Sequence, residues 1–328
     1  MIYNLTAAVI GSGFMGKQHI EILKNCVAKT VFCTTDTQTG KKISEETGLT
    51  LYTDYLEMFE KEKPDFVSIC LPTHLHFKAT IAALERGINV LCEKPFAQNV
   101  DEAKNMLDLA NQKNLTLMIA HCVRFSKYYE FLKRCVSDKR YGDLIYLDLF
   151  RHSEKPNWSV GNWLDDIKLS GGVVKDLHIH DTDIILKILG MPESIYTTGN
   201  TVSCKTTYNF KDLKASVTAS ASWRNVSEYD FLSGYDAIFE NASLTLKNKK
   251  LTLNTASGIE ENPLKNEIFS FFFEEDNNVK AEILYFCECL TNNLKPELCL
   301  SEDSYKTMII SDCELQSLDS DKKVNIFV

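Results

Sequence analysis

Short apolar runs alternate with stretches of helical spacing along the first 121 residues. Residues 65–71 are almost continuously apolar, as expected for a parallel strand that is buried on both faces. Residues 78–86 then repeat their apolar positions with the period of a helix, which Gly87 ends. Similar pairs recur at short intervals, and this alternation predicts a doubly wound parallel α/β sheet.

From residue 122 onward a different pattern appears, the period of two that is typical of a sheet with one packed face. The clearest case is 215–223, where Val, Ala, Ala and Trp alternate with Ser and Thr. Further strands are predicted at 143–150, 231–240, 243–247, 250–254 and 324–327, and helices at 279–292 and 304–318. The change of pattern predicts two domains, 1–121 and 122–328.

Composition excludes several classes of protein. The chain has 328 residues, 44% of them hydrophobic and 25% charged, as in ordinary globular proteins with two cores. A net charge of −9 without a basic stripe argues against nucleic acid or an anionic membrane as a partner. No apolar run approaches the ~18 residues of a membrane span. Eleven cysteines without C-x-x-C pairs, and no signal-peptide pattern, predict a cytoplasmic protein with reduced, mostly buried thiols.

The first apolar run ends in a glycine-rich turn, Gly-Ser-Gly-Phe-Met-Gly, at positions 11–16. Between a strand and a helix, Gly11 permits the tight turn, Gly13 lets the backbone approach a pyrophosphate, and Gly16 allows the helix to pack on the strand. The N–H groups and dipole at the helix start attract negative charge. The motif therefore predicts a dinucleotide site; an ordinary glycine turn is the alternative.

A second apolar run, 30–35, ends in Asp36, twenty residues after Gly16. A carboxylate at this place accepts hydrogen bonds from the adenosine ribose hydroxyls. Its charge repels a 2′-phosphate and no arginine follows it, so we expect NAD rather than NADP, although Lys41 and Lys42 weaken that preference. An ordinary surface aspartate is the alternative.

Polar groups follow the next two predicted strands. After Leu71 come Pro72, Thr73 and His76; Thr73 is the predicted N-cap of a helix. His76 would then lie in the first helical turn at the carboxyl edge of the sheet, where ligands bind, or else simply face water. Residues 88–92 are followed by Glu93-Lys94-Pro95, and the proline holds Lys94 in an extended conformation aimed at the same edge.

The helical stretch after Gly171-Gly172 carries the candidate acid–base pair. Asp176 and His180 are four residues apart and are predicted to share one helix face. Near a helix start Asp176 stays ionised, so it can bond one ring nitrogen of His180, fix the tautomer and raise the basicity of the ring. His180 is therefore a candidate general base. A salt-bridged helix face with a satisfied histidine is the alternative.

Three other potential metal ligands, His178, Asp181 and Asp183, lie in the same stretch. Their helical positions spread around the axis, so we expect no metal site there. Two tryptophans in the loop 153–166, Trp158 and Trp163, either stack on a sugar ring or pack the domain junction.

Together these motifs resemble the Gfo/Idh/MocA family, named after glucose–fructose oxidoreductase, inositol dehydrogenase and a rhizopine-catabolism protein. The matching set is G-x-G-x-x-G, Asp36, Pro72 with His76, Glu93-Lys94-Pro95, Arg124-Phe125 and Asp-x-x-x-His at 176–180. Where many members have Gly-x-Asn-x-Arg-Phe, this chain has Cys122 in place of the asparagine. The resemblance covers the whole chain. It implies a Rossmann domain, then an α/β domain with a large, mostly antiparallel open sheet through which many members form homodimers or homotetramers.

The resemblance also implies an activity: NAD-dependent transfer of a hydride to or from a hydroxyl or keto group of a sugar, polyol or cyclitol. The implied catalytic residues are Lys94, Asp176 and His180. The implied cofactor-binding residues are Gly11, Gly13, Phe14, Met15, Gly16, Asp36, Leu71, Pro72, Thr73, His76, Glu93 and Lys94. Two alternatives remain, an NAD-binding sensor of sugar metabolism without turnover and a glycosidase that uses NAD transiently.

Overall fold

Residues 2–156, 160–224 and 230–327 are described by the computed structural model, without the side chains of 160 and 161. Within it the chain divides into two units. The first contains residues up to Cys122, a short segment that ends at Trp163, and Glu275–Tyr305. The second contains the remaining parts of 123–274 and the stretch Lys306–Val328. The expected domain 122–328 thus contributes two of its segments to the first unit.

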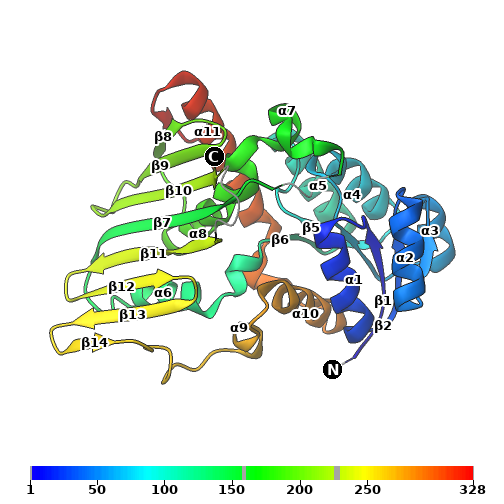
Figure 1. Ribbon diagram of the computed structural model, residues 1–328, viewed down its shortest axis with the longest axis horizontal. Coiled ribbons are helices and arrows are strands. Elements are labelled where there is room, and N and C mark those ends of the chain that lie inside the picture. Colours follow the sequence, from blue (N-terminus) through cyan, green and yellow to red (C-terminus); the bar gives the residue numbers. More distant parts are fainter. Residues whose placement is uncertain (1, 157–159, 225–229, 328) are drawn as a thin grey trace. The chain divides into compact units, whose positions relative to one another are not determined.

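Six parallel strands form the sheet of the first unit. They are β1 (Tyr3–Ile10), β2 (Val27–Cys33), β3 (Thr50–Tyr52), β4 (Phe66–Ile69), β5 (Asn89–Glu93) and β6 (Leu117–Ala120). Their order is β3-β2-β1-β4-β5-β6, and every neighbouring pair is parallel (Figure 1). This order reverses direction between β1 and β4, and ligands of such sheets bind at that switch point. The predicted doubly wound sheet is confirmed.

Helices connect these strands. They are α1 (Phe14–Cys26), α2 (Thr37–Thr47), α3 (Tyr55–Glu62), α4 (His76–Glu85), α5 (Val100–Lys113) and, from late in the chain, α10 (Asn278–Thr291). The short 3₁₀ turns η1 (Thr73–Leu75) and η5 (Glu297–Cys299) belong to the same unit. Helix α10 packs on α1 and on β1, and its Phe286 meets Phe66 of β4 edge-on with 5.3 Å between ring centroids. This packing makes the unit discontinuous in sequence.

A nine-stranded sheet forms the core of the second unit. Its strands are β7 (Leu144–Glu154), β8 (Ser194–Gly199), β9 (Ser203–Asn209), β10 (Ser216–Arg224), β11 (Leu232–Phe239), β12 (Ala242–Lys247), β13 (Lys250–Thr255), β14 (Gly258–Glu260) and β15 (Val324–Asn325). The order is β14-β13-β12-β11-β7-β10-β9-β8-β15, and only β7 and β10 run parallel to each other. The sheet is mostly antiparallel, as the family resemblance implied.

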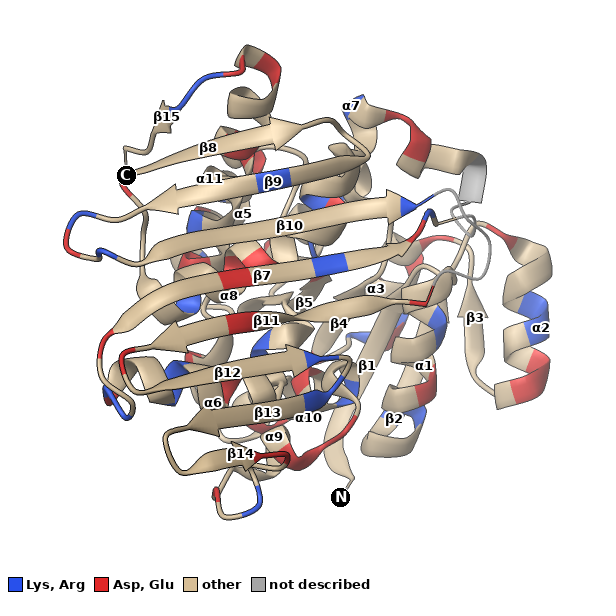
Figure 2. Ribbon diagram, turned by 60° about the vertical axis from the view of Figure 1, so that its left-hand side comes forward, with Lys and Arg blue, Asp and Glu red and all other residues tan. Residues whose placement is uncertain are grey.

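Helical segments also belong, wholly or in part, to the second unit. They include η2 (Cys122–Phe125), α6 (Lys127–Ser137), η3 (Val160–Asp165), α7 (Ile167–Ser170), η4 (Val174–His178), α8 (Ile179–Leu189), α9 (Phe271–Glu274) and α11 (Ser301–Ser320). Of these, η4 contacts β7 and β10, and α8 contacts β7. Figure 2 shows the sheet from the face opposite to α6 and α8, which lie behind the strands in this view. Residues of β10 alternate as predicted, with Val217, Ala219 and Ala221 completely buried.

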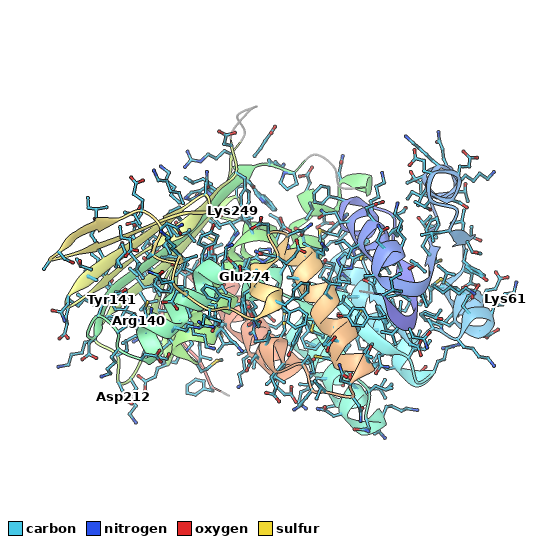
Figure 3. The ribbon with its side chains drawn as sticks, turned by 90° about the horizontal axis from the view of Figure 1, so that it is seen from below. Lys61, Arg140, Tyr141, Asp212, Lys249 and Glu274 are labelled. Carbon is cyan, nitrogen blue, oxygen red and sulfur yellow. The ribbon has the colours of Figure 1, made fainter. Side chains whose placement is uncertain are left out.

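Exposed charged side chains surround both units. Lys61 on α3 projects from the first unit, and Asp212 and Lys249 lie in turns of the second (Figure 3). Among the helices of the described residues, none has both the length and the apolar character needed to cross a bilayer.

Candidate active site

The glycine-rich turn joins β1 to α1 as the motif predicts. Gly11 has φ +106°, and a Cβ there would lie 2.4 Å from the carbonyl oxygen of Cys70. At Gly16 a Cβ would lie 2.1 Å from the carbonyl oxygen of Gly11. Any larger residue at either position therefore collides with backbone, so the turn and the close packing of α1 both require glycine.

Gly13 has a different role because no atom lies within 4 Å of where its Cβ would be. It is the N-cap of α1, and no side chain caps this helix end. Open space beside a helix N-terminus suits the negative charge of a pyrophosphate. Phe14 is 53% exposed and Met15 is half-buried on the first turn. The residues present therefore fit a dinucleotide.

Asp36 follows β2 at the same edge of the sheet and is exposed. It is the N-cap of α2, where its Oδ1 accepts a hydrogen bond from the amide of Thr39 at 3.0 Å. Hydrogen bonds from Thr39 lower the pKa of Asp36 and keep it ionised. A carboxylate has more acceptor positions than this cap uses, so capping leaves capacity for ribose hydroxyls.

The loop after β4 is held by His76. A 3₁₀ turn begins at Thr73 and α4 begins at His76, so the predicted N-cap role of Thr73 is wrong, whereas His76 does lie in the first turn of α4. The ring of His76 is 1% exposed, with Nε2 2.8 Å from the carbonyl oxygen of Leu71 and Nδ1 2.9 Å from that of Pro95. Burial lowers the pKa of His76. His76 thus ties two loops at the carboxyl edge together and does not face water.

Lys94 follows β5, and the Lys94–Pro95 peptide bond is cis. Within residues 90–97, all of which are described, only Lys94 is partly exposed. Every other side chain of this segment is buried, so the segment presents one ammonium group at the sheet edge.

Glu93 points the other way, into a buried cluster. Its Oε1 lies 3.0 Å from Nε2 of His19, and Nδ1 of His19 lies 2.6 Å from Oγ of Ser68. Glu282 of α10 completes the cluster: one ligand atom from each of His19, Glu93 and Glu282 lies within 4.8 Å of the other two. In the structure, the Glu93 carboxyl therefore braces α1 against β5.

Two members of this cluster, His19 and Glu282, have raised pKa values. Burial alone would lower the pKa of His19, but neighbouring Cys70 and Glu93 outweigh it and raise that pKa well above its ordinary value. Burial first, and then the charge of Glu93, raises the pKa of Glu282 well above its ordinary value. Both shifts favour the protonated forms of His19 and Glu282 within this buried cluster.

Asp176 lies in an irregular helical turn of the second unit, and His180 follows that turn by two residues. Residues Val174–His178 form a π-helical turn, closed by a hydrogen bond from the amide of Ile179 to the carbonyl of Val174, before regular α-helix begins. The stretch was expected to be α-helical throughout. A π turn holds more residues than an α turn, so side chains four positions apart are more nearly aligned along the helix axis.

Burial singles out the same two residues. Within residues 171–186, all described, every residue is buried except Asp176 and His180. The buried side of the turn includes Val173, Val174 and Leu177, which pack with side chains of β9 and β10. The π turn therefore presents one carboxyl group and one imidazole, and nothing else, at its open side.

The other potential ligands of this stretch point to three separate partners. Asp181 pairs with Arg151 at 2.8 Å. Asp183 receives two hydrogen bonds from Arg124, at 2.7 and 2.8 Å. His178 faces Glu314, as described below. All three thus diverge from His180, and Arg124 of the Arg-Phe motif acts as a brace for α8.

The loop tryptophans and Cys122 were also singled out from the sequence. The ring of Trp163 meets that of His74 edge-on, with 6.3 Å between centroids, whereas Trp158 falls outside the described residues. Cys122 is half-buried. None of the eleven cysteines, all described, forms a disulfide, and nine of them are buried, as predicted.

Two buried acid groups were missed from sequence. Glu282 lies among apolar residues of α10 and Glu314 among mixed residues of α11, and both are completely buried. The available signal for Glu282 was a carboxyl on the apolar face of an amphipathic helix. His19 could have been found as the histidine three residues after Gly16.

Two family models match the chain. Residues 5–121 match the oxidoreductase family with an NAD-binding Rossmann fold, Gfo/Idh/MocA. Residues 129–237 match the C-terminal domain of the same family.

Individual proteins are similar over shorter stretches. The 2,7-anhydro-N-acetylneuraminate hydratase of Mediterraneibacter gnavus is 27% identical over 197 residues, 60% of this chain and 52% of that protein. The D-glucoside 3-dehydrogenase of Escherichia coli is 29% identical over 195 residues, 57% of this chain and 55% of that protein. The matched stretches therefore span about half the length of these curated relatives.

The fold extends further than the sequence similarity. A levoglucosan dehydrogenase in complex with NADH and levoglucosan superposes with a TM-score of 0.84 at 18% identity, covering 98% of this chain and 99% of that chain. Strand order, motifs and family models agree: the chain belongs to the Gfo/Idh/MocA oxidoreductase family, and its N-terminal part is that family's NAD-binding Rossmann domain.

Proposed function

We propose that this protein is an NAD-dependent dehydrogenase that oxidises a hydroxyl group of a sugar, polyol or cyclitol, or reduces the corresponding ketone. One observation carries the proposal: two otherwise buried segments, 90–97 and 171–186, leave only Lys94, Asp176 and His180 partly exposed. An imidazole base with a carboxylate partner and an ammonium donor can assist loss of the hydroxyl proton while hydride leaves the same carbon for the cofactor.

In the proposed mechanism His180 accepts the proton of the substrate hydroxyl as general base. Lys94 donates a hydrogen bond to the same oxygen and orients it. Asp176 holds His180 in the required tautomer. NAD supplies the hydride acceptor when bound, and the protein supplies position and charge.

The proposed cofactor site uses the glycine turn for the pyrophosphate and Asp36 for the ribose. Leu71, Pro72, Thr73, His76, Glu93 and Lys94 complete it at the carboxyl edge of the sheet. His76 and Glu93 act indirectly in this proposal, because their side chains hold the loops in place. Asp36, which disfavours a 2′-phosphate, supports NAD over NADP.

Domain roles and assembly belong to the same proposal. Residues 1–121 bind the cofactor, and 122–328 bind the substrate and form a homodimer or homotetramer through the nine-stranded sheet. Exposed apolar side chains on that sheet, Ile145, Tyr196 and Ile238, support the assembly. The eleven free cysteines support a cytoplasmic location.

A spectrophotometric screen for NADH release over a panel of sugars, polyols and cyclitols tests the proposal. Proton transfer by a placed base contributes ~10²–10⁴-fold, so we expect His180→Ala to lose that order of turnover with NAD affinity nearly unchanged. Lys94→Ala should also lose turnover. Lys61→Ala, which removes an exposed lysine of α3, is the matched control. Turnover within tenfold of wild type in His180→Ala would contradict the catalytic assignment.

The same screen addresses the two alternatives. A sensor binds NAD and ligand but releases no NADH with any member of the panel. A glycosidase that uses NAD transiently forms hydrolysis products without net NADH. The presence of all three acid–base groups favours the dehydrogenase.

A further inference from the structure

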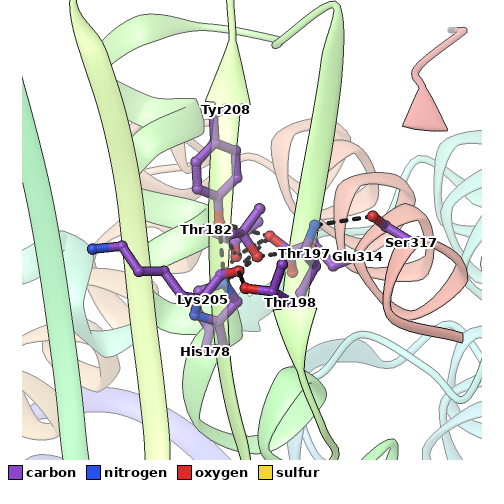
Figure 4. Close-up of polar contacts among 9 residues, drawn as sticks. His178, Thr182, Thr197, Thr198, Lys205, Tyr208, Glu314 and Ser317 are labelled. Carbon is purple, nitrogen blue, oxygen red and sulfur yellow. Dashed lines mark hydrogen bonds and ion pairs between the residues drawn. The ribbon is translucent and has the colours of Figure 1, made fainter. Parts of the chain in front are cut away.

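A buried polar cluster in the second unit surrounds His178, the histidine two residues before His180 (Figure 4). His178, Thr182, Thr206 and Glu314 are each 0% exposed. Burying so many polar groups costs free energy unless they bond one another. The proposed chemistry uses none of them.

Glu314 of α11 lies at the centre of the cluster. Its Oε1 accepts hydrogen bonds from the hydroxyl of Tyr208 at 2.6 Å and from Oγ1 of Thr182 at 2.9 Å. Nε2 of His178 lies 3.5 Å from the same oxygen. Burial, and then the nearby Glu314, raises the pKa of Tyr208 well above its ordinary value, so the phenol keeps its proton and acts as the donor.

The ring of His178 has a defined orientation. Its Nε2 lies 3.0 Å from Oγ1 of Thr206 and 3.2 Å from the hydroxyl oxygen of Tyr208, both on β9. Nδ1 is buried and has no hydrogen-bond partner among the described residues. Because the oxygens all gather at Nε2, the proton is at Nε2, and the ring is held between β9 and α11.

This cluster is attached to the π turn. His178 is the last residue of that turn, and Thr182 follows one turn later on α8. A second contact from α11 holds the other end: Nζ of Lys175 lies 2.5 Å from Oδ1 of Asp312. Helix α11 therefore contacts the π turn through two pairs of side chains, Glu314 with His178 and Asp312 with Lys175.

His178 stands midway between the two exposed groups. Successive residues of a helix are rotated by about 100°, so a side chain two positions from both Asp176 and His180 points away from them. Because the backbone connects them, fixing His178 on the buried side of the helix also fixes the direction in which Asp176 and His180 point. Wide helical turns are rare and often occur at functional sites, and they persist where the surroundings over-determine them.

We propose that His178 and Glu314 are positioning residues for His180: the hydroxyl of Tyr208 hydrogen-bonds both of them, and this buried link holds the π turn and thereby the aim of Asp176 and His180. The inference rests on the proposed function, which gives His180 its task. Relaxation of the turn to ordinary α-helix would rotate His180 relative to Asp176 by tens of degrees. Proton transfer requires heavy atoms about 3 Å apart, so such a rotation removes the base from its place.

Kinetics of the full-length protein with NAD give the first test. We expect His178→Leu to lower kcat by about 10–100-fold, with KM and NAD affinity within about threefold of wild type. His178→Gln places an amide N–H near the position of Nε2 and should restore most of the loss. Glutamine keeps an acceptor oxygen at position 314, so we expect the kcat of Glu314→Gln to be higher than that of Glu314→Leu.

The second test needs no substrate. In protein labelled with ¹³C at histidine, the His180 signal is assigned by its disappearance in His180→Ala. Its titration midpoint should shift in His178→Leu and return in His178→Gln. Ser317→Ala is the matched control, since Ser317 also lies on α11 and bonds the amide of Thr197 at 2.9 Å and the carbonyl of Lys322 at 2.6 Å. It should lower Tm without moving that midpoint.

The outcomes separate the two proposals. If His178→Leu and Glu314→Leu merely lower Tm as Ser317→Ala does, with kcat and the His180 titration as in wild type, the positioning role is overturned. If His180→Ala retains turnover, the proposed function fails, and a shifted His180 titration in His178→Leu still supports the physical tie between the two residues.

Discussion

Single side chains at this site carry two tasks at once. Asp36 caps α2 through Oδ1, which a surface aspartate would also do, and in the proposed function it also accepts hydrogen bonds from the ribose. His76 and Glu93 were expected to touch the cofactor, yet their polar atoms brace the surrounding loops. The residue types at these positions could be predicted from the motifs, but the partners they bond could not, because the partners lie far away in sequence.

Asp36→Asn separates the two tasks of Asp36. Asparagine keeps the N-cap, so Tm should stay within about 2 °C of wild type. It loses the charged acceptor, a hydrogen bond of ~1.5–3 kcal/mol, so NAD affinity should fall by about 10–150-fold and the preference over NADP should narrow. Calorimetric titration with both dinucleotides measures this. Asp54→Asn, at the matching N-cap of α3, is the control and should leave both affinities unchanged.

At the scale of elements, periodicity located most strands and helices where the structure has them. The exceptions have physical reasons. Strands β3, β8, β9 and β14 and helix α6 were not predicted. In β9 the inward residues Thr206 and Tyr208 belong to the polar cluster, so the strand gives no apolar alternation. The π turn was missed because its apolar stripe is equally compatible with α-helix. The assignment of residues 275–305 to the first unit depends on packing against α1, which a single sequence does not display.

The glycine turn allows two similar substitutions to be compared. Gly16→Ala puts a Cβ against backbone at 2.1 Å, so we expect a loss of about 3 kcal/mol in the free energy of unfolding, measured by urea denaturation without NAD. Gly13→Ala meets open space and should fold normally, but its methyl group should obstruct the pyrophosphate and weaken NAD binding. Equal stability of the two variants would contradict this account of the turn.

At the scale of the whole molecule, buried protons couple stability to pH. In the folded protein the pKa of Glu282 is raised above the ordinary value of 4.5, so the folded state keeps a proton that the unfolded chain releases. Rising pH above that value therefore favours the unfolded chain. His19 has the usual sign for a raised histidine: its contribution is full below its unfolded pKa and is lost as pH rises through its folded pKa.

Glu282→Gln removes this proton equilibrium and keeps the shape of the protonated acid. We expect a higher Tm than wild type, by on the order of 5 °C at pH 8, with a difference that shrinks as the pH falls towards 4.5. Scanning calorimetry from pH 4.5 to 8.5 measures it. Glu60→Gln, at an exposed position of α3, serves as control and should show no such trend. A pH-independent effect of Glu282→Gln would show that the carboxyl is not protonated in the folded state.

His178 and Glu314 are far apart in the sequence, and this separation has a consequence for biosynthesis. Glu314, whose carboxylate oxygen accepts a hydrogen bond from the Thr182 hydroxyl, lies 132 positions later in the chain. A ribosome therefore makes the acid–imidazole pair well before it makes the helix that supports it, and a domain generally folds as a unit. A growing chain that ends before α11 carries Asp176 and His180 without their anchor, so maturation of the site waits for one of the last helices to be translated.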